Sequence, residues 1–168
     1  MHFSKDFENI YIKYSDKIYR YVYLNTNDPY LAEDITSETF LRIWKKWKHI
    51  KQDFMQALLY KTAKNIIIDN YRKHGNAKKV SLEEIVEKGL EPSYDEDLIE
   101  KITSNDNIKK VNEAIKLLPQ NLREVVILRF INDLTARQVG QILDTTEVNI
   151  RVLQFRALKK LREIIKNE

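Results

Sequence analysis

The sequence predicts an all-α protein made of two small helical domains. Only three glycines and three prolines occur in 168 residues, and long stretches carry apolar residues at every third or fourth position, which is the period of an α-helix. The distribution of charged residues divides the chain into three segments. Residues 1–80 hold 15 basic and 9 acidic side chains, residues 81–106 hold 2 and 9, and residues 107–168 hold 12 and 7. We therefore expect two helical modules that each contact a polyanion, joined by an acidic linker.

The N-terminal domain, residues 1–75, is expected to be a bundle of three to four helices. The first helix runs from Phe3 to about Leu24. The second starts at Asp28-Pro29, with Asp28 as N-cap and Pro29 in the first turn, and ends near Trp47. Helical spacing predicts that one face of each is buried, at Phe3, Phe7, Ile10, Tyr11, Tyr14, Ile18, Tyr21, Val22, Leu31, Ile35, Phe40, Leu41, Ile43 and Trp44.

A third helix, from about Asp53 to Lys73, combines basic residues with aromatic ones. The residues of this expected surface are Lys61, Lys64, Asn65, Arg72 and Lys73, with Tyr60 and Tyr71. Cations can contact phosphates, rings can stack on bases, and an Asn can pair with a base edge, so the pattern suits single-stranded nucleic acid. A solvated helix face explains it equally well.

Acidic and polar side chains gather near the start of the second helix, at Glu33, Asp34, Ser37 and Glu38. The helix dipole favours acids there, which is a sufficient explanation from sequence alone. Asp34 and Glu38 lie one turn apart and could hold a magnesium ion, but exposed acids at that spacing usually form only a charged face.

The linker, residues 76–107, is acidic and has few residues that could build a core. Short helices are conceivable near Val80–Val86 and Leu98–Ile102. Its charge could keep it off DNA, imitate nucleic acid in a basic channel, or only add solubility.

The C-terminal domain, residues 108–168, is expected to contain four helices. One ends at Leu118-Pro119, and a second, Asn121 to about Ile131, should bury Leu122, Val125, Val126, Leu128 and Phe130. The last two form a helix-turn-helix motif, in which two helices cross at a tight turn.

Local signals define that motif. Thr135 and Gln138 are spaced as a capping box, and Leu134 and Val139 as a hydrophobic staple. Gly140 should cost about 1 kcal/mol inside a helix, so its presence indicates a close approach of the next helix. Asp144 and Thr145 form the turn, Asp144 in a left-handed conformation, and Thr146 caps the last helix.

The last helix, about Glu147 to Lys166, has two different faces. Ile150, Leu153, Ala157, Leu161 and Ile164 form an apolar stripe. The opposite face, which we call the recognition face, carries Arg151, Val152, Phe155, Arg156 and Lys159. Arginines can bond guanine edges or phosphates, and Val and Phe can contact thymine methyl groups in a major groove. An ordinary solvated face is the alternative.

Several function classes are disfavoured. The chain has no cysteine and three scattered histidines, so neither a disulfide nor a metal centre is expected. We find no glycine loop for a nucleotide and no nucleophile paired with a histidine, so neither a cofactor nor enzymatic activity is expected. With no signal peptide or apolar span, a soluble cytoplasmic protein without membrane contact is predicted.

Taken in order, the motifs resemble the extracytoplasmic-function group of bacterial RNA polymerase sigma factors. AEDITSETFLRIW (residues 32–44) resembles the polymerase-docking segment of the family, and LLYKTAKNIIIDNYRK (residues 58–73) its promoter-melting segment. LPQNLREVVILRF (residues 118–130) and the helix-turn-helix resemble its C-terminal domain. The resemblance covers nearly the whole chain.

The resemblance implies a role for each module. Asp34, Ser37 and Glu38 match the positions that dock on the clamp helices of core RNA polymerase. The loop from His49 to Asp53, with Lys61, Lys64 and Asn65, matches positions that open the minus-ten element and hold its melted strand. Arg151, Val152, Phe155 and Arg156 match positions that read the minus-thirty-five duplex. An anti-sigma factor is a further candidate partner.

The sequence departs from the family pattern at Leu153-Gln154, at the helix start Thr145, Glu147 and Val148, and in the short loop after Trp47. In a complex with DNA, Glu147 would place a carboxylate near the phosphates. Alternatively, it would accept a hydrogen bond from a cytosine amino group. Two rival functions remain at this stage: a free-standing regulator that binds an operator without polymerase, and an enzyme acting on nucleic acid.

Overall fold

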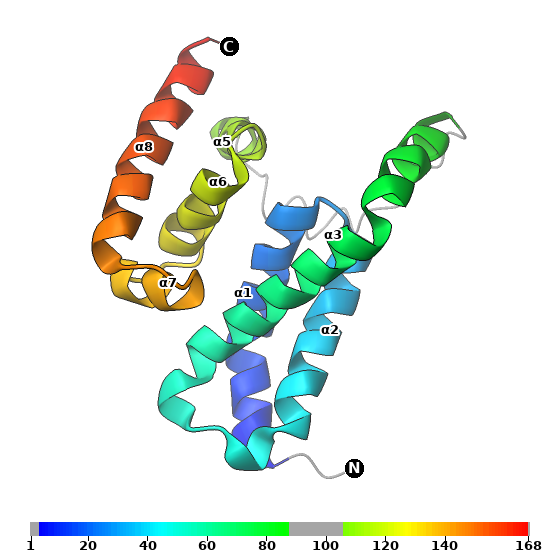
Figure 1. The fold of residues 1–168 in the computed structure, drawn as a ribbon, viewed down its shortest axis with the longest axis vertical. Coiled ribbons are helices and arrows are strands. Elements are labelled where there is room, and N and C mark those ends of the chain that lie inside the picture. Colours follow the sequence, from blue (N-terminus) through cyan, green and yellow to red (C-terminus); the bar gives the residue numbers. More distant parts are fainter. Residues whose placement is uncertain (1–3, 88–105, 168) are drawn as a thin grey trace.

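The computed structural model describes the backbone of residues 4–87 and 106–167 and the side chains of residues 4–74 and 109–167. These residues form helices and turns, and no strand occurs among them (Figure 1). The prediction of an all-α fold is confirmed. None of the helices in the described part is long and apolar enough to cross a membrane.

Helices α1 (Lys5–Thr26) and α2 (Pro29–Lys45) form an antiparallel pair joined by a tight turn. Asn27 takes a left-handed conformation at φ 56°, which ends α1. The Asp28 carboxylate then accepts hydrogen bonds from the backbone N–H groups of Tyr30 and Leu31, both at 3.1 Å. The cap predicted at Asp28-Pro29 is confirmed.

Helix α3 (Met55–Glu87) follows two short 3₁₀ turns, η1 (Trp47–His49) and η2 (Gln52–Phe54), and packs against both earlier helices. The predicted end near Lys73 is wrong, because the helix continues through Gly75. A single glycine costs only about 1 kcal/mol in a helix, and good helix formers follow it. The short helix expected at Val80–Val86 is thus the end of α3, and the one at Leu98–Ile102 lies outside the described residues.

Aromatic side chains fill the N-terminal core. The Phe7 ring makes edge contacts with Phe40, Trp44 and Trp47, at centroid distances of 6.5, 4.9 and 5.3 Å. Two positions predicted as buried are instead half exposed: Tyr11 at 49% and Leu41 at 53%. At 3.6 residues per turn, Leu41 lies on the side of α2 opposite the buried Ala32 and Ile43. Tyr11 lies on the buried side of α1, and its partly exposed ring makes an edge contact with Phe40 at a centroid distance of 4.9 Å.

The C-terminal domain contains α5 (Asp106–Lys116), α6 (Gln120–Val126), η3 (Ile127–Ile131), α7 (Ala136–Ile142) and α8 (Glu147–Lys166). The segment η3 is a π-helix that continues α6, and the N–H of Asn132 donates to the carbonyl of Ile127 at 2.9 Å. A π turn contains an extra residue, so it rotates the positions that follow. Phe130, predicted to be buried, lies in this π turn and is 48% exposed.

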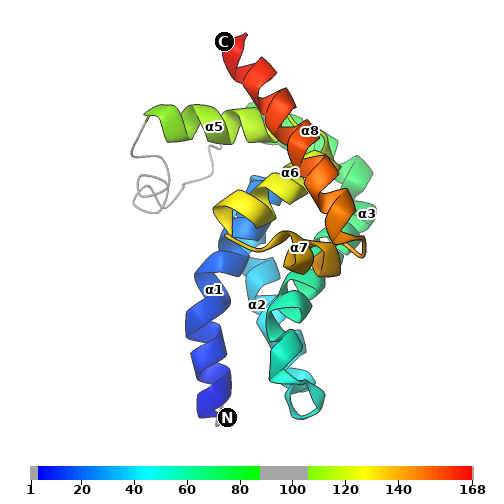
Figure 2. The ribbon, with the colours of Figure 1, turned by 90° about the vertical axis from the view of Figure 1, so that its left-hand side faces the viewer.

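The two domains are in contact (Figure 2). Helix α7 packs against α3, and η3 packs against α1. No local pattern in the sequence indicates this contact, which places the turn of the helix-turn-helix motif beside Lys61 of α3.

Candidate nucleic-acid interface

The recognition face is positioned by the capping of α7. The Thr135 hydroxyl accepts from the backbone N–H of Gln138 at 3.1 Å, and the Gln138 side chain accepts from the backbone N–H of Thr135 at 2.9 Å. Leu134 and Val139 are buried beside this capping box. The predicted box is confirmed, and the placement of the staple residues agrees with the prediction.

Gly140 permits the sharp crossing of α7 and α8. A Cβ atom added to Gly140 would lie 2.9 Å from the backbone carbonyl oxygen of Thr145, closer than side-chain carbons approach such atoms. The N–H of Thr145 also donates to the Gly140 carbonyl at 2.9 Å. The predicted close approach exists, and it is made by the backbone of the turn.

The turn itself follows the predicted pattern. Asp144 has φ 54°, in the left-handed region. The Thr146 hydroxyl accepts from the backbone N–H of Asn149 at 3.1 Å, which caps α8, and the Asn149 amide donates to the Thr145 hydroxyl at 2.9 Å. These bonds fix the direction in which α8 leaves the turn.

The two faces of α8 are separated as predicted. Ile150, Ala157 and Leu161 are buried, with Leu153 and Ile164 half-buried. All residues of the recognition face are exposed to solvent, including the Phe155 ring at 71% and Val152 at 42%. Val148, which the sequence analysis did not place on this face, is also exposed, at 68%.

Polar contacts hold two of the side chains on α8 in place. Arg151 forms an ion pair with Glu147, Nη2 to Oε1 at 2.6 Å. Arg129 donates from Nε to the Gln154 side chain at 2.9 Å and from Nη1 to the carbonyl of Leu134 at 2.6 Å. Gln154 is therefore held toward the domain interior, whereas Arg151 stays at the surface.

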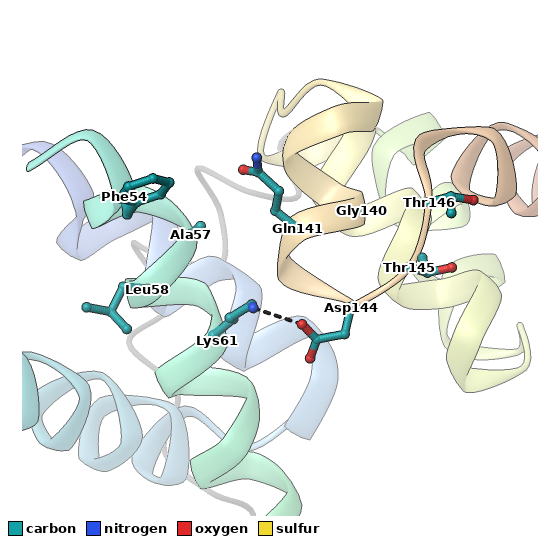
Figure 3. Close-up of a pocket in the computed structure, with 9 residues that line it drawn as sticks. All are labelled: Phe54, Ala57, Leu58, Lys61, Gly140, Gln141, Asp144, Thr145 and Thr146. Carbon is teal, nitrogen blue, oxygen red and sulfur yellow. Dashed lines mark hydrogen bonds and ion pairs between the residues drawn. The ribbon is translucent and has the colours of Figure 1, made fainter. Parts of the chain in front are cut away.

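The second expected surface lies on α3, and we call three of its residues, Lys61, Lys64 and Asn65, the α3 strip. The other residues expected there are Arg72, Lys73, Tyr60 and Tyr71. Lys64 and Lys61 are half-buried and Asn65 is exposed. Lys61 Nζ lies 2.8 Å from Asp144 Oδ1, so it contacts the turn of the helix-turn-helix (Figure 3). This hydrogen bond and the positive charge of Lys61 lower the pKa of the Asp144 carboxyl.

One aromatic residue assigned to this surface was placed wrongly. Tyr60 is fully buried and makes an edge contact with Tyr21 at a centroid distance of 5.5 Å. Burial raises the pKa of its hydroxyl. Tyr71 is 40% exposed, and its hydroxyl donates to the carbonyl of Asn25 at 2.9 Å. The expected surface therefore lacks Tyr60 as a stacking platform.

Glu124 is a buried acid that the sequence analysis missed. It lies on α6, is 9% exposed and accepts a hydrogen bond from the hydroxyl of Tyr21 on α1 at 3.2 Å. Burial raises the pKa of its carboxyl, while Lys64, the bond from Tyr21 and Arg123 partly oppose this rise. The one signal in the sequence was the position of this acid directly before the apolar run VVIL (residues 125–128).

The acidic segment of α2 lies on another part of the surface. Asp34, Ser37 and Glu38 are exposed, and Glu38 pairs with Arg42 at 2.5 Å, Oε1 to Nη2. The loop from His49 to Asp53 runs from the last residue of η1 into η2, and only Ile50 in it is half-buried. No group of three or more potential metal ligands occurs in the part of the chain that the structure describes.

Comparison with known proteins decides the family. Sigma-70 region 2 matches residues 10–77, and Sigma-70 region 4 matches residues 114–163. The chain is 28% identical over 158 residues to the ECF RNA polymerase sigma factor SigM of Bacillus subtilis, covering 94% of this chain and 93% of SigM. The chain belongs to the ECF group of the sigma-70 family.

Further similarities agree with this. The sigma factor BldN of Streptomyces coelicolor is 28% identical over 166 residues, covering 96% of this chain, which spans 61% of BldN. In fold, the chain resembles the sigma factor RpoE of Bartonella quintana, solved with the anti-sigma factor NepR, with a TM-score of 0.73 at 18% identity over 96% of this chain and 98% of RpoE. A second similar fold is that of CnrH, solved with the cytosolic domain of CnrY, with a TM-score of 0.70 at 15% identity over 96% of this chain and 88% of CnrH.

Proposed function

We propose that this chain binds core RNA polymerase and directs it to specific promoters, where it helps to open the DNA. The observation that carries this proposal is the presence of both sigma regions, in order, in one chain. A free-standing operator-binding regulator has no use for region 2, so the matches do not support that alternative. We assign the chain no covalent chemistry.

We assign a separate role to each domain and to the linker. We assign residues 1–75 to polymerase docking and to the minus-ten element, residues 76–107 to the linker, and residues 108–168 to the minus-thirty-five element. The docking positions are Asp34, Ser37 and Glu38, whose exposure on α2 leaves them available to a basic partner.

For duplex DNA we assign the recognition face of α8. Its side chains project from the same face of α8. The cationic ones suit phosphates and guanine edges, and the apolar ones suit thymine methyl groups. For the melted strand we assign Lys61, Lys64 and Asn65, through phosphate contacts and one base edge. An anti-sigma factor is the partner class that we propose for control, because structures of this fold were solved with such proteins.

Transcription reconstituted with purified core polymerase on a promoter library tests the proposal. Addition of the chain should yield transcripts from a small subset of templates that share two sequence blocks. The control omits the chain. Transcripts that are the same with and without it, together with tight operator binding by the chain alone, would favour the free-standing regulator.

A further inference from the structure

Glu147, the first residue of α8, forms an ion pair with a cation of the recognition face. Its Oε1 atom lies 2.6 Å from Nη2 of Arg151, one helical turn further along the same side of α8. The other two cations of this face, Arg156 and Lys159, form no ion pair or hydrogen bond with any residue that the structure describes. Arg151 is therefore the cation of this face whose guanidinium is held in place before DNA binds.

The carboxylate of Glu147 belongs to a well-ordered helix start. Thr146 caps α8 through the backbone N–H of Asn149, and the Asn149 amide donates to the hydroxyl of Thr145. The positive end of the helix dipole also favours a negative charge at this position. The first turn of α8 thus presents Glu147 as a fixed acceptor, and the ion pair restricts the rotamers of Arg151.

Arg151 lies at the end of α8 from which base contacts are expected. In helix-turn-helix proteins, the N-terminal residues of the recognition helix contact base edges in the major groove. The side chain of Arg151 is 66% exposed in spite of its ion pair. A guanidinium has more N–H donors than this pair uses, so donors remain for the O6 and N7 acceptors of a guanine.

The same carboxylate weakens binding to DNA that lacks a matching base. Glu147 places a negative charge beside the recognition face, where it repels phosphates and partly neutralises the attraction that Arg151 exerts on them. Hydrogen bonds from Arg151 to a base edge remain possible. The pair therefore lowers sequence-independent affinity more than sequence-specific affinity, and the ratio of the two determines specificity.

We propose that Glu147 is a positioning residue, which orients Arg151 toward one guanine of the minus-thirty-five duplex and does not contact a base itself. The inference rests on the proposed function of the recognition face. It goes further by assigning one base to one pair of side chains. It also gives Glu147 a role that differs from direct recognition of cytosine.

The base preference of the complete holoenzyme tests this inference. Core polymerase with the full chain is offered promoter duplexes in which each position of the minus-thirty-five element carries each of the possible bases. A duplex of unrelated sequence measures non-specific binding. The variants are Glu147→Ala, Arg151→Ala and the double variant. Glu163→Ala is the matched control, since Glu163 is an exposed acid of the same helix, lies near its other end and undergoes the same change in charge.

Arg151→Ala should abolish a preference for guanine at one position of the element. Glu147→Ala should weaken the preference at that same position about two- to fivefold, which is the range for loss of one exposed ion pair, and should strengthen binding to the unrelated duplex. Adding Glu147→Ala to Arg151→Ala should not change base preference further, because the two residues act as one unit. Glu163→Ala should keep the native base preference.

Native base preference in Glu147→Ala would overturn the inference. So would a cytosine preference that depends on Glu147 in the presence and absence of Arg151, because Glu147 would then contact the base directly. Promoter selection that does not depend on Arg151 would overturn the inference and leave the proposed function intact. A native holoenzyme that selects no promoter would instead contradict the proposed function, and the inference with it.

Discussion

At the scale of single residues, Gly140 is the position where the helix-turn-helix tolerates least change. Gly140→Ala would bring a Cβ atom within 2.9 Å of the Thr145 carbonyl oxygen, and this atom belongs to the backbone of a hydrogen-bonded turn. The cost of overpacking, about 1–3 kcal/mol, exceeds the gain of about 1 kcal/mol from the better helix propensity of alanine.

We therefore expect Gly140→Ala to lower the free energy of unfolding by up to about 2 kcal/mol and to weaken duplex binding by displacing α8. Urea denaturation measures the first effect. Gln141→Ala, at the neighbouring exposed position, should change stability by less than about 0.5 kcal/mol. Equal stability of both variants would show that the turn can move at little cost.

Glu124 gives a pH dependence whose direction follows from its environment. Burial raises the pKa of its carboxyl above the ordinary 4.5. As the pH rises through 4.5, the unfolded chain releases this proton before the folded chain does, so ionisation of Glu124 lowers the free energy of unfolding up to the raised pKa.

Glu124→Gln has no proton to release and keeps an oxygen that can accept from Tyr21. The free energy of unfolding of Glu124→Gln minus that of the native chain should therefore increase between pH 4 and pH 7. Chemical denaturation across that range measures it. Glu113→Gln, an exposed residue on α5, is the control, and the same slope in both variants would contradict a special environment at Glu124.

At the scale of elements, α8 is the helix to which we assign recognition of the minus-thirty-five duplex. Arg151→Ala or Arg156→Ala should weaken promoter recognition by about 1–3 kcal/mol where the arginine contacts a base. Arg162→Ala is the matched control, since Arg162 is exposed on the same helix but lies nearer its C-terminal end. Selection from a promoter library measures both affinity and base preference. Unchanged promoter choice in both variants would contradict the assignment of the recognition face to promoter DNA.

Helix α2 carries the proposed docking surface. Asp34→Lys with Glu38→Lys should abolish core-polymerase binding while leaving helical content unchanged, because both side chains are exposed and reversing them turns attraction into repulsion. Glu8→Lys with Asp16→Lys makes the same change in charge on α1, also at exposed positions. A pull-down in which both double variants retain core polymerase equally would place the docking surface elsewhere.

The parts of the fold and of the candidate site that depend on local sequence signals could be predicted. The capping box at Thr135, the left-handed Asp144 and the two faces of α8 follow from spacing and residue type, which act within a few positions of the chain. Tyr60 and Phe130 were placed wrongly for another reason. A tyrosine beside lysines, such as Tyr60, is compatible with either a surface or a core. Phe130 lies in a π turn, which no periodic pattern in the sequence predicts.

At the scale of the whole molecule, the sequence predicts two modules but not their contact. The pairs Lys61–Asp144 and Tyr21–Glu124 join residues separated by 83 and 103 positions. No helical period links such positions. A buried Glu124 also runs against the general rule that acids lie outside. Long-range contacts of this kind depend on the packing of complete domains.

We propose that the two modules act together, through polymerase, on one promoter. Open-complex formation on a selected promoter, with a fluorescent base in the minus-ten element, measures this directly when core polymerase is added to the native chain. We predict a fluorescence increase that requires both proteins and disappears with Asp34→Lys and Glu38→Lys. An increase produced by the chain alone, or one unaffected by that variant, would contradict the account.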